Sequence, residues 1–430
     1  MISTTKNGVY EWTPMTKQKS SRLHRFYEKP FDERIQLALQ ASGLPLESEK
    51  VLKQRALTSE LLDTFIENAI GGFEVPLGIA TNFLIDGRET LVPMAVEESS
   101  VVAAASYGAL LTRKAGGFTT KIDDPVMIGQ IQLFVTPGEV DEKIQVLEKA
   151  KLVILEKTNS KHSSLVARGG GAVDLNWRYI PEINSLVVHL YVHTCEAMGA
   201  NIVNTACEYT SQFLSDMLGV PYGLRILSNL SDSRVARSAC RVPKEYLGNK
   251  QFSSEQMIDG IVSASMFAEH DIYRATTHNK GVMNGVDPVV IATGNDWRAV
   301  EAGAHAFAAQ QGGYKPLATW RKDENGDLVG NIAIPLAIGT VGGVTRLHPG
   351  AKFALGLMGH PNSKELASII CSVGLAQNLS ALKALATEGI QEGHMSLHQK
   401  NLLLQHKNGL EQTHVGSERS KNGRENPPSL

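Results

Sequence analysis

The sequence has few cysteines, and their spacing does not suit a metal site or a disulfide framework. Only four cysteines occur among 430 residues, and no two of them stand in a CxxC spacing. Zinc sites and disulfide-stapled domains both need regularly spaced cysteines, so neither is expected to hold this fold together. The HExxH pattern of zinc-dependent hydrolases is also missing. We therefore expect no metal.

Long apolar runs and a strong charge are missing as well. No run of about 18 apolar residues is present that would cross a membrane, and residues 1–20 contain no apolar core of a secretory signal. The formal net charge of −2 provides no basic surface for nucleic acid or for an anionic membrane. These absences predict a soluble, cytoplasmic protein that has neither nucleic acid nor a membrane as a partner.

A glycine-rich GxGxxG fingerprint directly after a strand is absent, so a Rossmann domain is not indicated. An apolar fraction of 42% is ordinary for a globular protein and is enough to fill a sizeable core. A length of 430 residues predicts two or three domains.

The middle of the chain predicts a small, separate domain. Apolar strands and amphipathic helices follow one another in the order β-α-β-β-α-β, which is the ferredoxin-like pattern. The strands are expected at 127–136, 173–179, 185–193 and 224–228, and the helices at 140–156 and 199–218. We place this inserted domain at 124–230. A larger α+β domain is then formed by residues 1–123 and 231–390, which it interrupts.

The flanking segments predict a mixed set of helices and strands. An Asp-Gly turn at Asp86 joins two apolar runs between Phe83 and Val92, which predicts a β-hairpin. A further strand is expected at 328–335, and a Gly-rich turn follows it at 338–343. Helices are expected at 31–42, 57–69, 99–111, 255–269, 297–311 and 363–386.

The stretch from Thr277 to Trp297 contains candidate catalytic groups. We expect Lys280 and Asn284 on a Gly-rich polar loop, an Asp-Pro turn at Asp287, and a short buried strand that ends before Asp296. A lysine on such a loop can stabilise a developing oxyanion, and an aspartate nearby can keep it charged. A loop with a surface lysine and a helix-capping aspartate fits the same residues.

Five motifs in order resemble those of class II 3-hydroxy-3-methylglutaryl-coenzyme A reductases, the soluble bacterial and archaeal type. The resemblance extends over roughly residues 21–401. The motifs are ENAIGG at Glu67–Gly72, PMAVEESSVVAAAS at Pro93–Ser106, EAMGANIVNT at Glu196–Thr205, the Thr277–Trp297 stretch, and GHMSLH at Gly393–His398.

The resemblance implies a four-electron reduction of the glutaryl thioester to mevalonate, with release of coenzyme A. Lys280 matches the family's oxyanion-stabilising lysine, and His394 matches the acid that protonates the leaving thiolate. Glu98 matches the acid that protonates the alkoxide, and we expect burial beside Val96, Val101 and Val102 to raise its pKa. Asp296 would join Lys280 and Glu98 in one network.

The resemblance also assigns the binding groups. Arg274 matches the arginine that binds the substrate carboxylate, and the other substrate contacts are Ser100, Asn229 and Asn284. The coenzyme contacts are Asp174, Glu196, Met198, Gly199 and Asn201, with Glu196 standing where an aspartate is usual. A carboxylate at Asp174 accepts hydrogen bonds from a ribose 2′-hydroxyl and repels a 2′-phosphate, so NADH is weakly favoured over NADPH.

The implied architecture has a large mixed α/β substrate domain, the inserted domain as nicotinamide-binding domain, and a short C-terminal flap at 391–430. It also implies a homodimer, with Glu67–Gly71 at the interface of the active sites. Two other functions stay open: the same enzyme working oxidatively in mevalonate breakdown, and a non-catalytic module that binds coenzyme A thioesters. A lysine Schiff-base lyase is disfavoured, because Asp296 near Lys280 favours a charged lysine over the lowered pKa that such a nucleophile needs.

Overall fold

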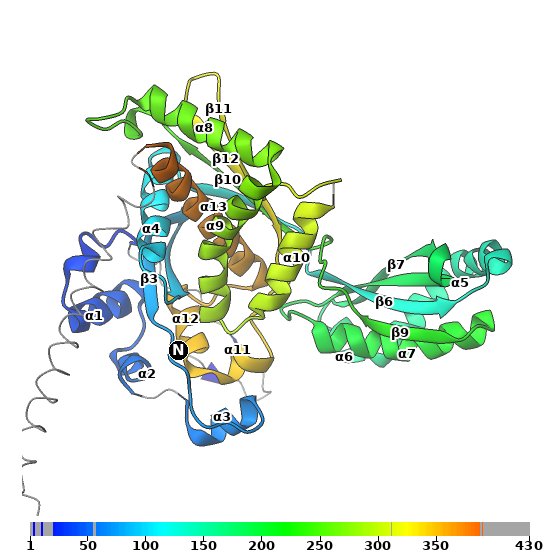
Figure 1. Cartoon of the computed structure of the whole chain (residues 1–430). Helices are drawn as coiled ribbons and strands as arrows, with labels where there is room; N and C mark the ends of the chain where they lie inside the picture. Colours follow the sequence, from blue (N-terminus) through cyan, green and yellow to red (C-terminus); the bar gives the residue numbers. More distant parts are fainter. Residues whose placement is uncertain are drawn as a thin grey trace, which may run out of the picture.

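The computed structural model describes residues 3–4, 10–11, 20–54, 57–310, 312–387 and 389. Within these ranges the chain forms a large body and a smaller lobe that projects from one side of it (Figure 1). At the start of the chain, the two-residue strands β1 (Ser3–Thr4) and β2 (Tyr10–Glu11) pair with each other. The predicted flap at 391–430 lies outside the described residues.

The large body is built on a six-stranded sheet, mostly antiparallel, in the order β11-β12-β10-β5-β3-β4. Strand β3 is parallel to β5, and the other pairs are antiparallel. The strands are β3 (Leu77–Ile85), β4 (Arg88–Ala95), β5 (Phe118–Ile122), β10 (Val235–Val242), β11 (Ala318–Lys322) and β12 (Leu328–Pro335). The predicted hairpin is present as β3 and β4, with Asp86 and Gly87 both at positive φ in the turn.

Helices surround this sheet, and short 3-10 turns connect several elements. The α-helices of the body are α1 (Phe31–Ser42), α2 (Lys50–Lys53), α3 (Ser59–Phe65), α4 (Val101–Thr112), α8 (Ser254–His270), α9 (Ile272–Ala292), α10 (Trp297–Ala309), α11 (Gly343–Leu347), α12 (Pro349–Leu357) and α13 (Ser363–Ala386). The 3-10 turns of the whole chain are η1 (Phe26–Glu28), η2 (Leu46–Glu49), η3 (Arg113–Ala115), η4 (Pro137–Glu139), η5 (Pro181–Ile183) and η6 (Lys244–Tyr246).

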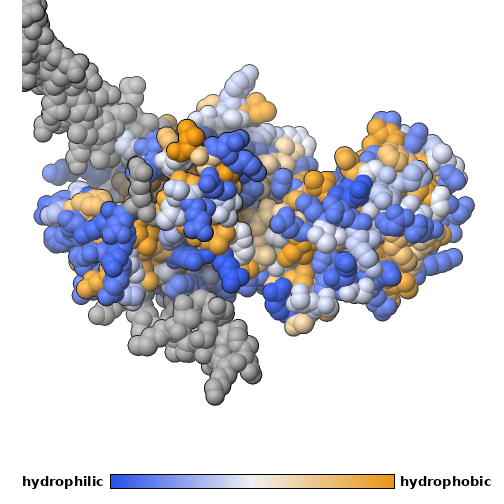
Figure 2. All heavy atoms as spheres, turned by 90° about the horizontal axis from the view of Figure 1, so that it is seen from below, coloured by the Kyte–Doolittle hydropathy of each residue, from blue (hydrophilic) through white to orange (hydrophobic). Residues whose placement is uncertain are grey.

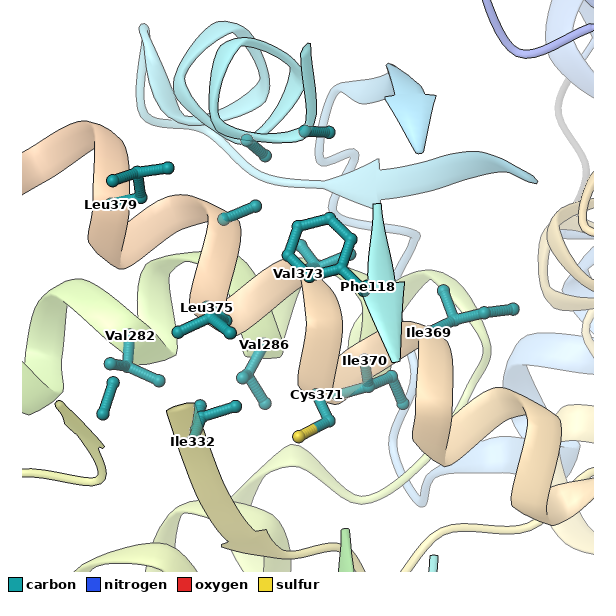
Figure 3. Packing of buried hydrophobic residues seen from close by; sticks show 14 of the residues in the cluster. Phe118, Val282, Val286, Ile332, Ile369, Ile370, Cys371, Val373, Leu375 and Leu379 are labelled. Carbon is teal, nitrogen blue, oxygen red and sulfur yellow. The ribbon is translucent and has the colours of Figure 1, made fainter. Parts of the chain in front are cut away.

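Helix α13 is the centre of the core. It packs against the strands of the large sheet and against α4, α8 and α9. Figure 3 shows its side chain Leu375 beside Val286 of α9 and Ile332 of β12, while Val373 lies next to Phe118 of β5. In the described part of the chain it is the one helix long and apolar enough to span a membrane, and here it lies within the protein core.

The smaller lobe has the ferredoxin-like order that the sequence predicts. Its antiparallel sheet runs β7-β8-β6-β9, and helices α5 and α7 pack on it. The elements are β6 (Val126–Phe134), α5 (Val140–Lys161), α6 (Ser163–Val166), β7 (Gly171–Ile180), β8 (Ser185–His193), α7 (Ala200–Leu218) and β9 (Tyr222–Leu227). A separate apolar cluster fills the lobe.

The prediction for the Lys280 segment is wrong. The structure has no polar loop, Asp-Pro turn or strand there, because residues Ile272–Ala292 form the single helix α9. Its N-cap Asp271 accepts a hydrogen bond from the Arg274 backbone N–H at 2.7 Å. A proline in a helix interior costs about 3 kcal/mol, and burial of the helix offsets this. Fully buried apolar residues repeat at helical spacing along α9, and they include Val282, Val286, Val289 and Val290.

Candidate functional site

Helix α9 displays Lys280 and Asn284 on one face, since residues four apart in a helix are neighbours. The Lys280 ammonium Nζ lies 3.4 Å from Oε2 of Glu98. The side chains of Lys280 and Glu98 are 63% and 42% exposed, so both reach solvent at the surface of this chain. The structure thus brings together the two residues expected to stabilise and protonate the substrate oxygen.

Glu98 lies in the turn between strand β4 and helix α4, together with Ser100. Ser100 adopts a left-handed backbone conformation with φ 77° just before α4 begins. Non-glycine residues adopt this conformation rarely, and such residues cluster at functional sites. The hydroxyl Oγ of Ser100 is buried and has no hydrogen-bond partner among the described residues. A buried hydroxyl without a partner is suited to a ligand that supplies one.

The described structure differs from two expectations about the catalytic carboxylates. The apolar burial expected for Glu98 is not found, because its side chain is 42% exposed. Asp296 does not join the network through a hydrogen bond or ion pair among the described residues. It is instead the N-cap of α10, where its Oδ1 accepts from the backbone N–H groups of Arg298 and Ala299 at 3.1 and 3.2 Å.

The remaining predicted substrate residues lie on different elements. Arg274, in the first turn of α9, is half-buried and forms no ion pair within the described ranges, and burial lowers its pKa. A half-buried arginine without a carboxylate partner suits a substrate carboxylate. Asn229 is exposed in the link between β9 and β10, and its carbonyl oxygen packs closely on Gly303 of α10. His394 lies outside the described residues.

The end of β8 and the start of α7 form a candidate dinucleotide cradle. Gly199 adopts φ 103° directly before α7, and no side chain among the described residues caps that helix. Uncapped N–H groups at a helix N-terminus bind phosphate groups well. Met198 is half-buried in this turn, and Asn201 is exposed in the first turn of α7. These residues fit the pyrophosphate of a nicotinamide dinucleotide.

The Gly-rich turn after β12 packs directly on this cradle. Ala197 forms a parallel bridge with Val341. A Cβ at Gly339 would lie 2.4 Å from the Met198 backbone nitrogen, so only glycine fits there. The Gly-rich turn therefore lies directly against the cradle.

Glu196 makes contacts that sequence reasoning did not anticipate. Its Oε2 accepts from the backbone N–H of Ser363, the first residue of α13, at 2.6 Å, and from the Thr340 hydroxyl at 3.2 Å. The buried guanidinium of Arg234 supports the same junction and donates to the carbonyl oxygens of Ala197 and Met198. In the described structure the Glu196 carboxylate therefore holds the lobe to the large body.

Asp174, near the start of β7, forms an ion pair with Lys151 of α5, with 2.5 Å between Oδ1 and Nζ. The hydrogen bond from Lys151 lowers the pKa of Asp174. The sequence contains no cation close after Asp174 until Arg178, but the fold brings Lys151 to it from another element. A helix-to-strand contact of this kind carries no local sequence pattern.

No group of three or more His, Cys, Asp or Glu side chains in the described ranges is placed to hold a metal ion. The candidate groups of the site are an ammonium next to a carboxyl, a half-buried arginine, a buried hydroxyl and a helix N-terminus. Such a set binds an anionic substrate and stabilises negative charge on its reacting oxygen.

Comparison with known proteins identifies the family. The family model described as hydroxymethylglutaryl-coenzyme A reductase matches residues 30–399. The chain is 46% identical over 397 residues to the 3-hydroxy-3-methylglutaryl-coenzyme A reductase of Archaeoglobus fulgidus, covering 92% of this chain and 89% of that protein. It is 35% identical to a probable reductase of Borreliella burgdorferi, covering 80% and 78%.

A solved structure agrees with this assignment. The class II reductase of Streptococcus pneumoniae, bound to NADPH in open conformations, superposes with a TM-score of 0.81 at 40% identity. The match covers 84% of this chain and 99% of that one. The chain thus belongs to the hydroxymethylglutaryl-coenzyme A reductase family and is an NAD(P)H-dependent oxidoreductase.

Proposed function

We propose that Glu98, Lys280, Asp296 and His394 carry the chemistry of this reductase. Two hydride equivalents and two protons convert the thioester into a primary alcohol and release coenzyme A as its thiol. The nicotinamide supplies a hydride to the carbonyl carbon in each of the two steps. The single observation that supports the proposal is the 3.4 Å distance between Lys280 Nζ and Glu98 Oε2, which brings a cation and a carboxyl group together.

Each residue has a distinct task. Lys280 donates hydrogen bonds to the carbonyl oxygen as negative charge develops on it. Glu98 gives a proton to that oxygen when the aldehyde is reduced to the alcohol. His394 protonates the departing thiolate, whose reference pKa of about 8.5 makes an acid that titrates near neutrality effective. Asp296 contributes its carboxylate at the start of α10.

The substrate is bound by groups around α9 and α4. We assign the glutaryl carboxylate to Arg274, because its guanidinium has no competing carboxylate among the described residues. The buried Ser100 hydroxyl and the Asn284 amide, which follows Lys280 by one helical turn, bind the polar groups of the thioester. Asn229 completes the set from the link between β9 and β10.

The coenzyme lies against the N-terminus of α7, with Met198, Gly199 and Asn201 around its phosphates. Glu196 supports this turn through Ser363 and Thr340. Asp174 favours NADH through the ribose 2′-hydroxyl, while Lys151 beside it offers a cation to a 2′-phosphate. We propose NADH as the preferred coenzyme, with the Asp174–Lys151 pair setting the size of the preference.

The protein acts as a homodimer in the cytoplasm. The support for the dimer is the apolar surface of the segment after α3, where Ile70 and Phe73 are almost fully exposed. Apolar exposure concentrated in one segment marks an interaction surface. On the face of the molecule that Figure 2 presents, hydrophobic residues (orange) lie among hydrophilic ones (blue). Glu67–Gly72, which lies in this segment, would then face the partner's active site.

Mixing two inactive variants tests the shared site. Lys280→Ala disables its own centre, and Glu67→Ala disables the neighbouring one. In a randomly reassorted dimer population, half of the dimers are mixed and hold one intact site of two, so activity recovers to about a quarter of wild type. No recovery after confirmed subunit exchange contradicts a shared site. Sedimentation of the wild-type protein as a monomer under assay conditions contradicts the dimer itself.

The direction of the reaction in the cell follows metabolite levels, and we propose the reductive direction, toward mevalonate and isoprenoids. The oxidative alternative uses the same residues. Measuring kcat/KM for thioester reduction and for coenzyme A-dependent mevalonate oxidation compares the two directions. A protein that oxidises mevalonate but fails to reduce the thioester at neutral pH contradicts the proposed direction.

A further inference from the structure

Two acidic side chains meet between helices α9 and α10, at a place that the proposed chemistry does not use. Asp287 follows Lys280 by seven residues and Asn284 by three, so all three lie on the same face of α9. Glu301 of α10 is hydrogen-bonded to Asp287 through its carboxyl group. Helix α10 packs on α9 and begins at Asp296. The acid pair therefore lies in the contact between the helix of Lys280 and the helix of Asp296.

The contact continues through a chain of hydrogen bonds. Glu301 Oε2 lies 2.6 Å from Nε2 of His305, and Nδ1 of His305 lies 2.6 Å from the hydroxyl of Tyr314. Tyr314 in turn interacts with the side chain of Asn279, the residue before Lys280. This series of side-chain interactions starts on α9 at Asp287 and ends on α9 at Asn279. It therefore holds α9 on both sides of Lys280.

Asn279 is itself fixed. It is fully buried, donates to the carbonyl of Lys315 at 2.9 Å and accepts from the N–H of Leu317 at 2.8 Å. The Asn279 end of the chain is therefore anchored to the segment that leads into β11. The Asp287 end has no comparable anchor, since its Oδ1 is buried without a hydrogen-bond donor among the described residues.

Two ionised carboxylates cannot hydrogen-bond to each other, because neither carries a donor. No lysine or arginine in the described ranges pairs with Asp287 or Glu301 to offset two negative charges, and His305 is the one ion-pair partner of Glu301 there. Glu301 is also the charged group whose electrostatic field acts on Asp287. The other elements that pack on α9 contribute no further charge to Asp287, and they are α4, α8, α12, α13 and β4. One proton shared by the two carboxyl groups removes one negative charge and supplies the donor for the hydrogen bond between them.

We propose that Asp287 and Glu301 share one proton and act as a positioning pair that fixes α9, and with it Lys280, against α10. The proposal rests on the assignment of Lys280 and Asp296 to the active site, but the acid pair can be tested without turnover. Neither acid touches the reacting atoms. Their effect on the reaction is indirect, through the placement of one helix against the other.

The protonation of the pair sets an upper limit on the pH range in which α9 and α10 stay in contact. Burial, and then the hydrogen bond and charge of Glu301, raise the pKa of Asp287 to about 8. Above that pH both groups ionise and repel each other across the contact. Below it the shared proton keeps the two helices together, and the pair then holds Lys280 near Glu98.

Asp287→Asn supplies an amide donor to Glu301 that does not depend on pH. We expect it to keep kcat within about threefold of wild type at pH 7 and to move an alkaline decline of kcat upward by about one pH unit or more. Asp287→Leu keeps the branched shape of the side chain, at a larger volume, but removes the hydrogen bond. We expect it to lower kcat about tenfold or more across the whole range while the fold is retained.

Glu324→Gln, at an exposed hairpin turn with no ion pair among the described residues, is the matched control and should leave the pH profile unchanged. An alkaline decline that stays in place in an active Asp287→Asn variant overturns the proposal. So does an Asp287→Leu variant that is as active as Asp287→Asn, because the hydrogen bond would then be irrelevant.

A second measurement separates the acid pair from the active-site assignment. The contribution of the pair to stability should fall as pH rises from about 4 to about 8, because the folded protein holds a proton that the unfolded chain has lost. The Tm of Asp287→Asn relative to that of wild type should therefore rise over this range, whether or not Lys280 is catalytic. A Tm difference that does not change with pH overturns the shared proton. A Tm difference that rises with pH, together with an active Lys280→Ala variant, instead contradicts the active-site assignment alone.

Discussion

Lys280 of α9 and Glu98 before α4 are 182 residues apart in the chain, yet the Lys280 ammonium lies 3.4 Å from the Glu98 carboxylate. The two side chains are 63% and 42% exposed, and exposed ion pairs contribute little to stability. The contact is compatible with the catalytic roles proposed for Lys280 and Glu98. A cation and an acid that converge on one point match the needs of a carbonyl that is reduced and then protonated.

Replacing Lys280 by alanine should lower kcat/KM for thioester reduction at least about a hundredfold, because the developing oxyanion loses its cation. Tm should stay within about 2 °C, since the ion pair with Glu98 is exposed. Steady-state kinetics and thermal unfolding measure the two effects. Lys322→Ala, which removes a surface ion pair with Asp259, is the control. Activity within threefold of wild type would remove Lys280 from the reaction.

Replacing His394 by glutamine should separate the two reductions. The thiolate leaves only when the thioester is the substrate, so this variant should lose thioester reduction far more than reduction of free mevaldehyde. The two substrates are compared at equal coenzyme concentration. Equal losses on both would show that His394 has a different role.

Coenzyme preference should depend on the Asp174–Lys151 pair. Asp174→Ala removes the carboxylate that repels a 2′-phosphate, so the ratio of kcat/KM for NADH to that for NADPH should fall. Lys151→Ala removes the cation and should raise the same ratio. The wild-type protein should prefer NADH. If both variants keep the wild-type ratio, the pair does not lie at the coenzyme.

Stability on the acid side should depend on His278 of α9. Its Nε2 lies 3.0 Å from the Ala318 carbonyl oxygen, and burial lowers its pKa to about 4. The unfolded histidine titrates near 6.5, so its contribution to stability is present above that pH and is lost as pH falls toward about 4. His278→Asn should show a shallower fall of Tm between pH 7 and 4. The control is His24→Asn, at an exposed position.

Local patterns were sufficient for the small lobe and for the β3–β4 hairpin. Alternating apolar residues predicted the strands, and the Asp86-Gly87 turn set the hairpin, because these features depend on neighbours in the sequence. The bounds of helix α13 were also predicted, and the structure shows one long helix where either a long helix or a helix pair was expected. The family motifs selected both Lys280 and Glu98, although no local pattern indicates that these two residues meet.

The error at α9 has a specific physical cause. Gly285 reads locally as a loop residue, but in the structure it allows close helix packing. A Cβ there would lie 2.8 Å from Cβ of Gln377 and 2.9 Å from the Val373 carbonyl oxygen on α13. Pro288 is likewise tolerated because the helix is buried. Tertiary packing overrides local propensity here, and a single sequence does not reveal such packing.

Contacts between distant elements were also beyond local reasoning. The Glu196 contact with Ser363 joins the lobe to α13, and the Lys151 contact with Asp174 joins a helix to an edge strand. The Asp287–Glu301 pair depends on the packing of α9 on α10. Each is set by the fold as a whole.

The most direct test of the account is the stoichiometry of the complete reaction. Purified protein is mixed with the hydroxymethylglutaryl thioester and excess NADH or NADPH, and coenzyme oxidation and free thiol are followed together. We expect two molecules of NADH or NADPH to be oxidised for each thiol released. The same ratio is expected in slow active-site variants that still turn over. Binding of the thioester without coenzyme oxidation would contradict it and would favour a non-catalytic binding module.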